Sequence, residues 1–552
     1  LPVLPFFTFI AAMFITMVLI PPLMRSAERF SFIDNPGERK IHATPIPRIG
    51  GVAMVVGAVT PVLLWADRPP LVLAFLIGIG VILVFGIWDD RKPLDFRVKF
   101  LGQFIAITIV VFYGGVEIRH LPFQGIEPVP TYISIPFTYF ALLGVTNAIN
   151  LADGLDGLAG GTMLLTTAAI GLLAYMAGDN LLLIFCLAVM GSIIGFLRYN
   201  TFPAQIFMGD CGSQFLGFAV GVLVILLTQV SNPALSPSMT LLILGLPIID
   251  TFIVMGQRVL RGGSPFSPDK NHVHHKLLAV GLDHYEAVLI IYVAQAVLVT
   301  TAFVFRFESD LFVMSLFSGI LLAVVGIFRY AEHVGWAAHE RPTGEPRTTL
   351  GKLVRDLRKS GVMSSYPTAF VAVSVPIYLL YAVARSGDIP IDGAVSIFIL
   401  FGMSITCFSL YRRDPKFRML ERIVVYIVAT MTVYYWHTTN PGYRGLYSFE
   451  NGYFVVLTLA LALAYRFSRH RQFSVTPTDF LVIFLAVIAP GFIGSIVSDG
   501  NVMAIGSKTV ILFYAVELIV TRLSGRELMF RGVVAFITGA MLLNALGVPQ
   551  IV

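Results

Sequence analysis

The chain contains many apolar runs of about 20 residues, the length that a helix needs to cross the hydrocarbon core of a bilayer. Apolar residues make up 57% of the chain, charged residues only 13%, and the mean hydropathy is +0.83. Backbone groups in lipid must pair internally, and the alternation typical of strands is absent, so the runs indicate helices. The sequence therefore predicts an all-α polytopic integral membrane protein.

Two groups of spans are separated by a polar segment. We expect the first eleven spans near residues 4–24, 50–66, 71–88, 99–113, 134–149, 160–177, 181–198, 213–230, 239–257, 286–305 and 310–328. We expect seven more near residues 367–385, 391–411, 419–436, 451–466, 479–498, 508–522 and 530–548. This pattern predicts a membrane domain (1–328), a cytoplasmic linker (329–366) and a C-terminal membrane region (367–552) without a recognisable role. The linker stretch "LGKLVRDLRKSGV" is either a basic amphipathic helix on the inner leaflet or a solvated helix.

The basic residues predict the orientation of the spans. With the N-terminus outside, clusters such as "RRDPKFR" and "RFSRHR" fall in inside loops, and outside connections such as "VSNPALSPS" are nearly free of Lys and Arg. The net charge of +6 follows from the same bias, and no arginine-rich arm or recognition motif indicates nucleic acid. The polar side chains that could bind a ligand or take part in chemistry lie almost entirely in the inside loops of the first eleven spans. A multi-pass protein with a cytoplasmic site is therefore expected.

Two of these loops carry phosphate- or cation-binding side chains. The stretch "HATPIPRIGG" contains His42 and Arg48, whose planar guanidinium suits phosphate, beside two glycines; a positive-inside loop with turn residues is the alternative. The stretch "WDDRKPLDFRVK" places Asp89 and Asp90 at the inner end of the third span. These adjacent carboxylates either hold a divalent cation, handle a proton or form a solvated helix end.

The stretch "NAINLADGLDGLAGG" places Asn147, Asn150, Asp153 and Asp156 at every third position. On an α-helix each of these groups is rotated about 60° from the last, so the first and the last would face opposite sides. The glycines favour a break. We therefore expect a helix that ends near Asn150 and continues as a loop that approaches a ligand closely. A glycine-rich turn capped by Asn and Asp is the alternative.

Two more loops complete the set. Asp210 lies between glycines in "MGDCGS" at a helix N-terminus, which favours either a phosphate with its cation or a simple N-cap. In "SPDKNHVHHKLL", three histidines lie between two lysines: Lys270, His272, His274, His275 and Lys276. Zinc is one possible ligand of such histidines, but no cysteine is near and the basic neighbours favour phosphate or a nucleotide. The intramembrane Asp250 is either functional or a helix-packing partner.

In these segments the sequence resembles the polyprenyl-phosphate N-acetylhexosamine-1-phosphate transferases, the superfamily of WecA and MraY. The matching segments, in family order within residues 1–328, are His42–Gly51, Asp89–Arg91, Asn147–Gly161, Phe207–Ser213, Pro247–Thr251 and Ser264–Leu278. The resemblance implies a helical bundle in the bacterial inner membrane that transfers a sugar 1-phosphate from a UDP-sugar to polyprenyl phosphate and releases UMP, with Mg²⁺ or Mn²⁺.

The resemblance also assigns roles to residues. It implies Asn150 and Asp210 as metal ligands. The resemblance also implies that four carboxylates are essential, those of Asp89, Asp90, Asp153 and Asp156. The candidate substrate-binding residues are His42, Arg48, Asn147, Lys270, His272, His274 and His275. A homodimer, and docking of downstream pathway enzymes on residues 367–552, are further expectations.

The histidine motif indicates the branch of the superfamily. Asp-x-x-His-x-His-His before an apolar pair is similar to the WecA-like pattern, whereas the peptidoglycan branch usually has a Glu soon after His-His, where this chain has Lys276. The motif predicts a WecA-like enzyme that uses UDP-GlcNAc or another UDP-N-acetylhexosamine in the first membrane step of a cell-surface glycan pathway. The alternatives are a phospho-MurNAc-pentapeptide transferase and a transporter or flippase of a lipid-linked sugar.

Overall fold

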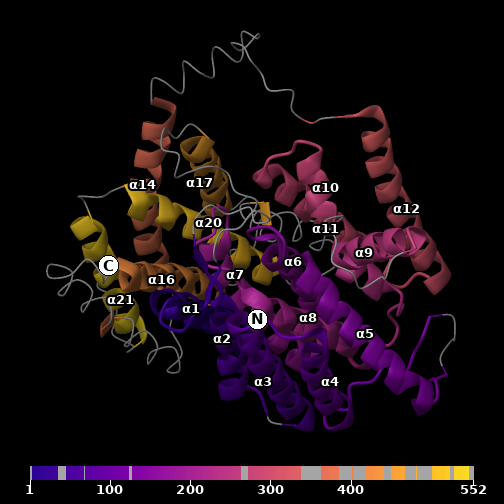
Figure 1. Cartoon of the computed structure of the whole chain (residues 1–552). Helices are drawn as coiled ribbons and strands as arrows, with labels where there is room; N and C mark the ends of the chain where they lie inside the picture. Colours follow the sequence, from indigo (N-terminus) through magenta and orange to yellow (C-terminus); the bar gives the residue numbers. More distant parts are fainter. Residues whose placement is uncertain are drawn as a thin grey trace. The chain divides into compact units, whose positions relative to one another are not determined.

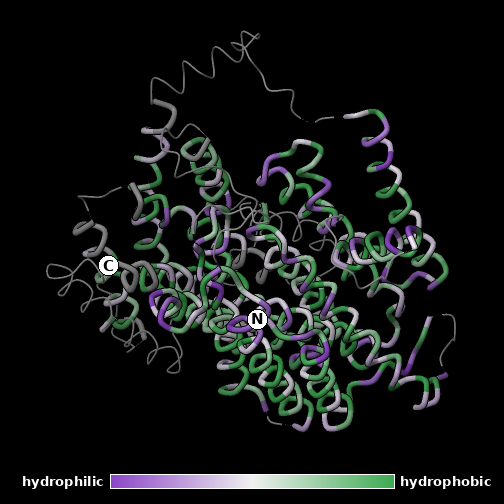
Figure 2. The backbone as a smooth tube through the Cα atoms, viewed as in Figure 1, coloured by the Kyte–Doolittle hydropathy of each residue, from purple (hydrophilic) through white to green (hydrophobic). Residues whose placement is uncertain are grey.

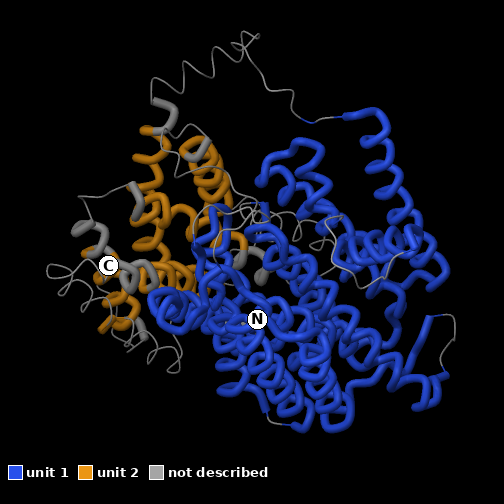
Figure 3. The backbone as a smooth tube through the Cα atoms, viewed as in Figure 1, with its two compact units in different colours: residues 1–342, 476–481 blue, residues 343–475, 482–552 orange. Residues whose placement is uncertain are grey.

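The computed structural model describes most of the N-terminal part of the chain and five long helices of the C-terminal part (Figure 1). The described residues are 3–34, 45–67, 69–122, 127–262, 272–336, 338, 362–384, 401–402, 418–439, 449–466, 480–481, 500–522 and 527–545. The chain divides into two compact units, residues 1–342 with 476–481 and residues 343–475 with 482–552 (Figure 3). The boundary at residue 342 falls within the segment predicted as the linker.

Each of the eleven spans predicted for the first unit coincides with a helix. These helices are α1 (Val3–Ser26), α2 (Gly50–Trp65), α3 (Pro70–Arg91), α4 (Phe96–Phe112), α5 (Thr131–Ala152), α6 (Leu158–Ala177), α7 (Asn180–Asn200), α8 (Gly209–Leu226, continued by the π-helical turn η1, Leu227–Ser231), α9 (Met239–Leu260), α11 (His284–Val304) and α12 (Asp310–Val334). The short helix α10 (Val273–Ala279) follows α9, and strands β1 (Ile33–Asp34) and β2 (Ile46–Pro47) pair antiparallel.

Apolar residues dominate these helices along their length (Figure 2). Among the described residues, ten helices are long and apolar enough to cross a membrane. The protein is therefore a multi-pass, all-α membrane protein, which confirms the predicted fold class. Helix α12 extends to Val334, so the first residues of the predicted linker are helical.

Helix α8 forms the centre of the first unit. Every residue from Cys211 to Leu226 is buried, and α2, α3, α5, α6 and α7 all pack against this helix. Small residues permit the close approach, as is common between membrane helices. A Cβ on Gly51 or Gly86 would collide with the backbone of Cys211 or Gly212, at the start of α8. The loop before α8 is thereby held tightly between α2 and α3.

Helix α9 is broken inside the membrane-spanning region. Gly245 adopts φ 43° and ψ −109°, two residues before Pro247. The side chain of Gln295 on α11 repairs the break, because its Oε1 accepts from Leu246 N at 2.9 Å and its Nε2 donates to Ile243 O at 2.9 Å. Non-helical backbone is tolerated at membrane depth only when it is paired in this way. The break redirects the second half of α9, which carries Asp250.

The described helices of the second unit match five of the seven spans predicted there. They are α14 (Val362–Ala384), α16 (Arg418–Thr439), α17 (Phe449–Arg466), α20 (Gly500–Arg522) and α21 (Glu527–Ala545). The predicted spans 391–411 and 479–498 lie largely outside the described residues.

A buried polar cluster lies between four helices of this unit. Glu450 on α17 accepts hydrogen bonds from Tyr378 Oη at 2.8 Å and Trp436 Nε1 at 3.0 Å. The ammonium of Lys508 on α20 lies 2.9 Å from Glu450 Oε2 and 3.2 Å from His437 Nε2. Because buried charges are stable only when paired, the cluster ties α14, α16, α17 and α20 together.

Candidate active site

The described end of the "HATPIPRIGG" segment fixes the loop before α8. Phe207 N donates to Pro47 O at 2.8 Å, Gly50 N donates to Phe207 O at 2.9 Å, and Gly51 N donates to Met208 O at 2.9 Å. The two segments, which are far apart in the sequence, thus run side by side as paired backbone. This pairing places Asp210 at the start of α8.

The carboxylate of Asp90 holds the backbone at Asp210 and Cys211 in place. The side chain is buried, and its two carboxylate oxygens accept from Asp210 N at 2.8 Å and Cys211 N at 3.0 Å. These are unpaired N–H groups at the start of a helix, where a carboxylate is favourable. Arg48 Nε lies 3.7 Å from Asp90 Oδ1, and its Nη1 lies 3.5 Å from Asp34 Oδ1. In this arrangement Asp90 positions the Asp210 loop, and Arg48 packs against Asp90.

Asp89 and Asp210 converge on one cation. The Lys99 ammonium, from the first turn of α4, forms ion pairs with both carboxylates, at 3.2 Å from Asp210 Oδ2. The other oxygen of Asp89 accepts from Leu94 N at 2.7 Å, which fixes the carboxylate's orientation. Two carboxylates at a membrane edge therefore share a single positive charge.

Asn150 completes this cluster from the last turn of α5. Its Nδ2 donates to Asp210 Oδ1 at 2.8 Å and lies 2.8 Å from Ser213 Oγ. Helix α5 ends at Ala152, two residues beyond the end expected near Asn150. Asp89, Lys99, Asn150 and Asp210 come from the ends of α3, α4, α5 and α8. Since consecutive antiparallel spans alternate in direction, these ends meet at one face of the bundle.

The cluster fits a hard divalent cation such as Mg²⁺. Mg²⁺ prefers oxygen ligands and is usually held by one or two carboxylates, with waters and substrate phosphates in the other positions. Asp89 and Asp210 supply such carboxylates, Asn150 adjoins them through its amide nitrogen, and the Lys99 ammonium shows that the site already accommodates positive charge. Within the described part of the chain no group of three or more His, Cys, Asp or Glu forms a closed metal cage.

The other polar residues of the Asn147–Gly161 segment lie in separate parts of the structure. Asp156 Oδ2 accepts from Ala204 N at 2.9 Å and so holds the loop between α7 and α8. Asp153 is exposed. Asn147 Nδ2 donates to Gln103 Oε1 at 2.8 Å, inside the bundle. Gly157 has φ +81°, a conformation that glycine adopts readily, and it immediately precedes α6. The repeat of three thus distributes its polar groups over separate tasks.

The histidine motif is anchored by Asp250. Asp250 Oδ2 lies 2.7 Å from His272 Nδ1, and its Oδ1 accepts from Val273 N at 2.7 Å, at the start of α10. The next histidine of the motif lies against the Asn147–Gly161 segment, because a Cβ on Gly154 would collide with the His274 imidazole. The intramembrane acid therefore places the histidines beside the loop that follows Asn150.

His274 is neutral at physiological pH. Burial, with the neighbouring His275 and His272 acting in the same direction and Asp250 opposing them, lowers the pKa of His274 to about 3. The ring centroids of His274 and His275 are 4.2 Å apart. His274 can thus offer a hydrogen bond to a ligand in this loop but adds no charge.

The structure brings together Asp89, Asn150 and Asp210, and places Asp90 directly behind them. His42 and Lys270 lie outside the described residues. Lys99 was not predicted from the sequence as a site residue. The feature that could have identified it is a lysine in the first turn of a membrane span, where a charge is costly. Also not predicted were Tyr292, whose Oη donates to Gly157 O at 2.6 Å, and Asn200, whose Oδ1 accepts from Gly157 N at 2.9 Å.

Comparison with known proteins identifies the family. Residues 72–228, which include Asp89, Asn150 and Asp210, match Glycosyl transferase family 4. The chain is 35% identical over 329 residues, 58% of this chain and 91% of the relative, to a protein of Bacillus subtilis named as a probable undecaprenyl-phosphate N-acetylglucosaminyl 1-phosphate transferase. The chain belongs to the polyprenyl-phosphate N-acetylhexosamine-1-phosphate transferases. The resemblance in its motifs is thereby confirmed.

Two further relatives of this transferase family show the same relationship. A decaprenyl-phosphate N-acetylglucosaminephosphotransferase of Mycolicibacterium smegmatis is 35% identical over 300 residues, 48% of this chain and 73% of the relative. An undecaprenyl-phosphate alpha-N-acetylglucosaminyl 1-phosphate transferase of Yersinia pestis is 30% identical over 278 residues, 49% of this chain and 76% of the relative. In each alignment this chain is longer than its relative, and about half of it is aligned.

Proposed function

We propose that the protein transfers N-acetylglucosamine 1-phosphate from UDP-GlcNAc to polyprenyl phosphate, giving a polyprenyl-diphosphate sugar and UMP. The observation that carries this proposal is the cluster at the ends of α3, α4, α5 and α8, in which Asp89 and Asp210 pair with the Lys99 ammonium and Asn150 donates to Asp210. The relatives' names support N-acetylglucosamine as the sugar and a transferase over a transporter. A site at the end of the bundle also suits a water-soluble donor and a lipid acceptor.

The acceptor needs little activation. A phosphomonoester has a second pKa of about 6, so the polyprenyl phosphate is already largely ionised at neutral pH. Its oxygen attacks the sugar-bearing phosphorus, the phosphoanhydride bond breaks, and UMP leaves with the electron pair of that bond. No general base is required for this step. Asp90 therefore acts by positioning the Asp210 loop, whereas Asp89 faces Lys99 and Asp210 within the proposed metal site.

Mg²⁺ or Mn²⁺ is proposed at Asp89, Asn150 and Asp210. When bound, such an ion neutralises charge on the diphosphate oxygens and aids the departure of UMP. On the protein side, the Lys99 ammonium is the neighbouring cation that can move between the carboxylates and a substrate phosphate. Asn150 orients Asp210 through the 2.8 Å hydrogen bond.

The histidine motif is proposed to bind the nucleotide-sugar. Asp250 fixes His272, and the neutral His274 borders Gly154 in the loop that leads from Asn150. A donor bound beside this loop and α10 would place its diphosphate near Asn150. Hydrogen bonding, not charge, is then the contribution of His274.

A UMP-release assay tests the reaction. The purified full chain is incubated with polyprenyl phosphate, Mg²⁺ and a panel of UDP-sugars. We expect UMP to appear with UDP-GlcNAc and to depend on the lipid acceptor. UMP release that does not require polyprenyl phosphate, or a strict preference for UDP-MurNAc-pentapeptide, would contradict the proposal.

We further propose direct displacement, without an aspartyl-phosphate intermediate. Donor labelled in the phosphate next to the sugar is mixed with the enzyme and Mg²⁺ before any acceptor is added. We expect no label on the acid-quenched protein. Labelled protein that later passes its label to polyprenyl phosphate would overturn direct displacement while leaving the overall reaction unchanged.

A cytoplasmic site is proposed from the positive-inside bias of the loops. Sealed inverted membrane vesicles should release UMP from externally added UDP-GlcNAc, whereas right-side-out vesicles should not.

A homodimer is a further proposal, tested by the mass of the purified protein in detergent. Docking of downstream pathway enzymes on residues 367–552 is tested by cross-linking in native membranes.

A further inference from the structure

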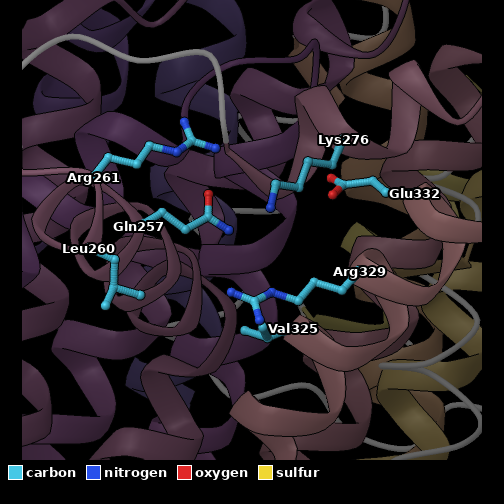
Figure 4. A pocket seen from close by; sticks show the side chains of 7 residues that line it. All are labelled: Gln257, Leu260, Arg261, Lys276, Val325, Arg329 and Glu332. Carbon is cyan, nitrogen blue, oxygen red and sulfur yellow. The ribbon is translucent and has the colours of Figure 1, made fainter.

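A pocket lies on the side of α10 that faces α12. It has a volume of about 190 Å³ and is lined by Gln257, Leu260, Arg261, Lys276, Val325, Arg329 and Glu332 (Figure 4). The lining comes from the last turn of α9 and the residue after it, from α10 and from the last three turns of α12. No catalytic candidate named above lines this pocket.

The pocket has an excess of positive charge. Figure 4 shows the guanidinium groups of Arg261 and Arg329, the Lys276 ammonium and the Gln257 amide reaching into the same space. Among the described residues that line the pocket, Glu332 is the one carboxylate. Neither Arg261 nor Arg329 forms an ion pair with another described residue. Arginine side chains that converge with a lysine and an amide are the groups that bind a phosphate.

The size and position of the pocket favour a lipid headgroup. The volume is below the range of about 300–1,000 Å³ that is usual for pockets holding drug-sized ligands, so the pocket matches a phosphate group better than a complete nucleotide-sugar. Its apolar lining, Leu260 and Val325, lies where two predicted spans reach their inner ends, and Leu260 is 80% exposed. Most of α12 is also exposed in the structure, as expected for a helix that faces lipid.

The pocket and the candidate active site lie on different sides of α10. His274 faces Gly154, whereas the Lys276 ammonium lies 5.4 Å from the centre of the Phe328 ring on α12. Two residues along an α-helix correspond to a rotation of about 200°, so the two side chains point in nearly opposite directions. A ligand in the pocket would therefore contact α10 without entering the reaction centre.

We propose that this pocket binds a phosphate group carried by an anionic membrane lipid. The lipid phosphate is held by Arg261, Lys276 and Arg329, its acyl chains run along the apolar side of α12, and the bound lipid joins the inner ends of α9 and α12 to α10. Binding at this site is independent of the proposed transferase reaction. A free phosphate ion shares the same chemistry, and the experiment below separates the two sources.

Lipid retention by the full-length protein tests the proposal. The protein is reconstituted in phosphatidylcholine nanodiscs that contain phosphatidylglycerol, transferred to detergent, and its retained phosphatidylglycerol is measured by native mass spectrometry. We expect the wild type to retain the lipid. The variant Arg261→Gln/Arg329→Gln should lose affinity by about tenfold or more, because two charge-assisted contacts are removed. Glu332→Gln should increase retention, since it removes a carboxylate that opposes an anionic ligand.

Two controls make the result specific. Arg97→Gln removes an exposed arginine at the start of α4, on the same predicted face but outside the pocket, and should retain lipid as the wild type does. Inorganic phosphate is offered alone and as a competitor. Equal retention by wild type and the double variant would overturn the proposal, as would an equal loss in Arg97→Gln. Pocket-dependent binding of inorganic phosphate without lipid retention would overturn the lipid assignment.

Discussion

The carboxylate of Asp90 accepts a hydrogen bond from the backbone amide of Asp210 at 2.8 Å, across 120 residues of sequence. Adjacent carboxylates on α3 therefore have different surroundings. Asp90 faces the backbone of the α8 N-terminus, whereas Asp89 faces Lys99 and the Asp210 side chain. This difference predicts that the two residues respond differently to the same substitution.

Asp210→Asn should abolish UMP release while the protein remains folded, because the cluster loses one of the two carboxylates that face Lys99. Asp90→Asn should instead lower the stability by about 1–3 kcal/mol, since a buried acceptor of two N–H groups is replaced. Thermal unfolding in detergent and UMP release at saturating Mg²⁺ distinguish the two variants. Activity of Asp210→Asn near that of the wild type would exclude Asp210 as a metal ligand.

Lys99→Met removes the cation shared by Asp89 and Asp210. Without metal, two neighbouring carboxylates then repel each other, and the protein should unfold at a lower temperature. Added Mg²⁺ should raise the unfolding temperature of Lys99→Met by more than that of the wild type, because the ion no longer competes with the ammonium. An identical Mg²⁺ response in both proteins would show that Lys99 and the ion do not share the site.

Gly154→Ala should disturb the histidine motif, because the new Cβ would collide with the His274 imidazole. A displacement of about 1 Å in a reacting site can lower the rate by about 100-fold, so kcat/KM for UDP-GlcNAc should fall strongly. Gly144→Ala is the matched control: Gly144 lies in α5 with no atom close enough to meet a Cβ among the described residues. Equal activity of the two variants would contradict the placement of His274.

His274 predicts a pH dependence of stability. Its folded-state pKa is about 3, below the ordinary value of 6.5, so between these values the unfolded state binds more protons than the folded state. Its contribution to stability is complete above pH 6.5 and is lost as the pH falls towards 3. Because His272, His275 and Asp250 lie beside the group, the comparison uses His274→Gln. The difference in unfolding temperature between wild type and this variant should change in this pH range and remain constant above it.

The buried pair of Glu450 and Lys508 should stabilise the second unit only as a pair. Lys508→Met leaves Glu450 without its counter-charge and should cost about 3–5 kcal/mol, as is usual when one partner of a buried ion pair is removed. The double variant Lys508→Met/Glu450→Gln should recover part of this loss. The single variant Glu450→Gln completes the double-mutant cycle, so thermal unfolding is measured for the wild type and all three variants, and additive effects would show that the contact contributes nothing.

The sequence by itself determined the fold class, because apolar runs of membrane length without the alternation of strands form helices when every backbone group must pair in lipid. It also located the helices of the first unit to within a few residues. The alternating direction of successive spans further predicted that the inner ends of α3, α5 and α8 would share one face. The identity of the chemical groups at that face, including Asp89, Asn150 and Asp210, was readable from the motifs.

Tertiary structure decided what each group does. Asp89 and Asp90 are neighbours in sequence, but only the packing of α8 against α2 and α3 turns one carboxylate towards backbone amides and the other towards Lys99. Likewise, only the contact between α10 and Gly154 separates His274 from Lys276. Local sequence specifies the helix that carries a residue, whereas long-range backbone pairing and close glycine contacts specify the partner that its side chain meets.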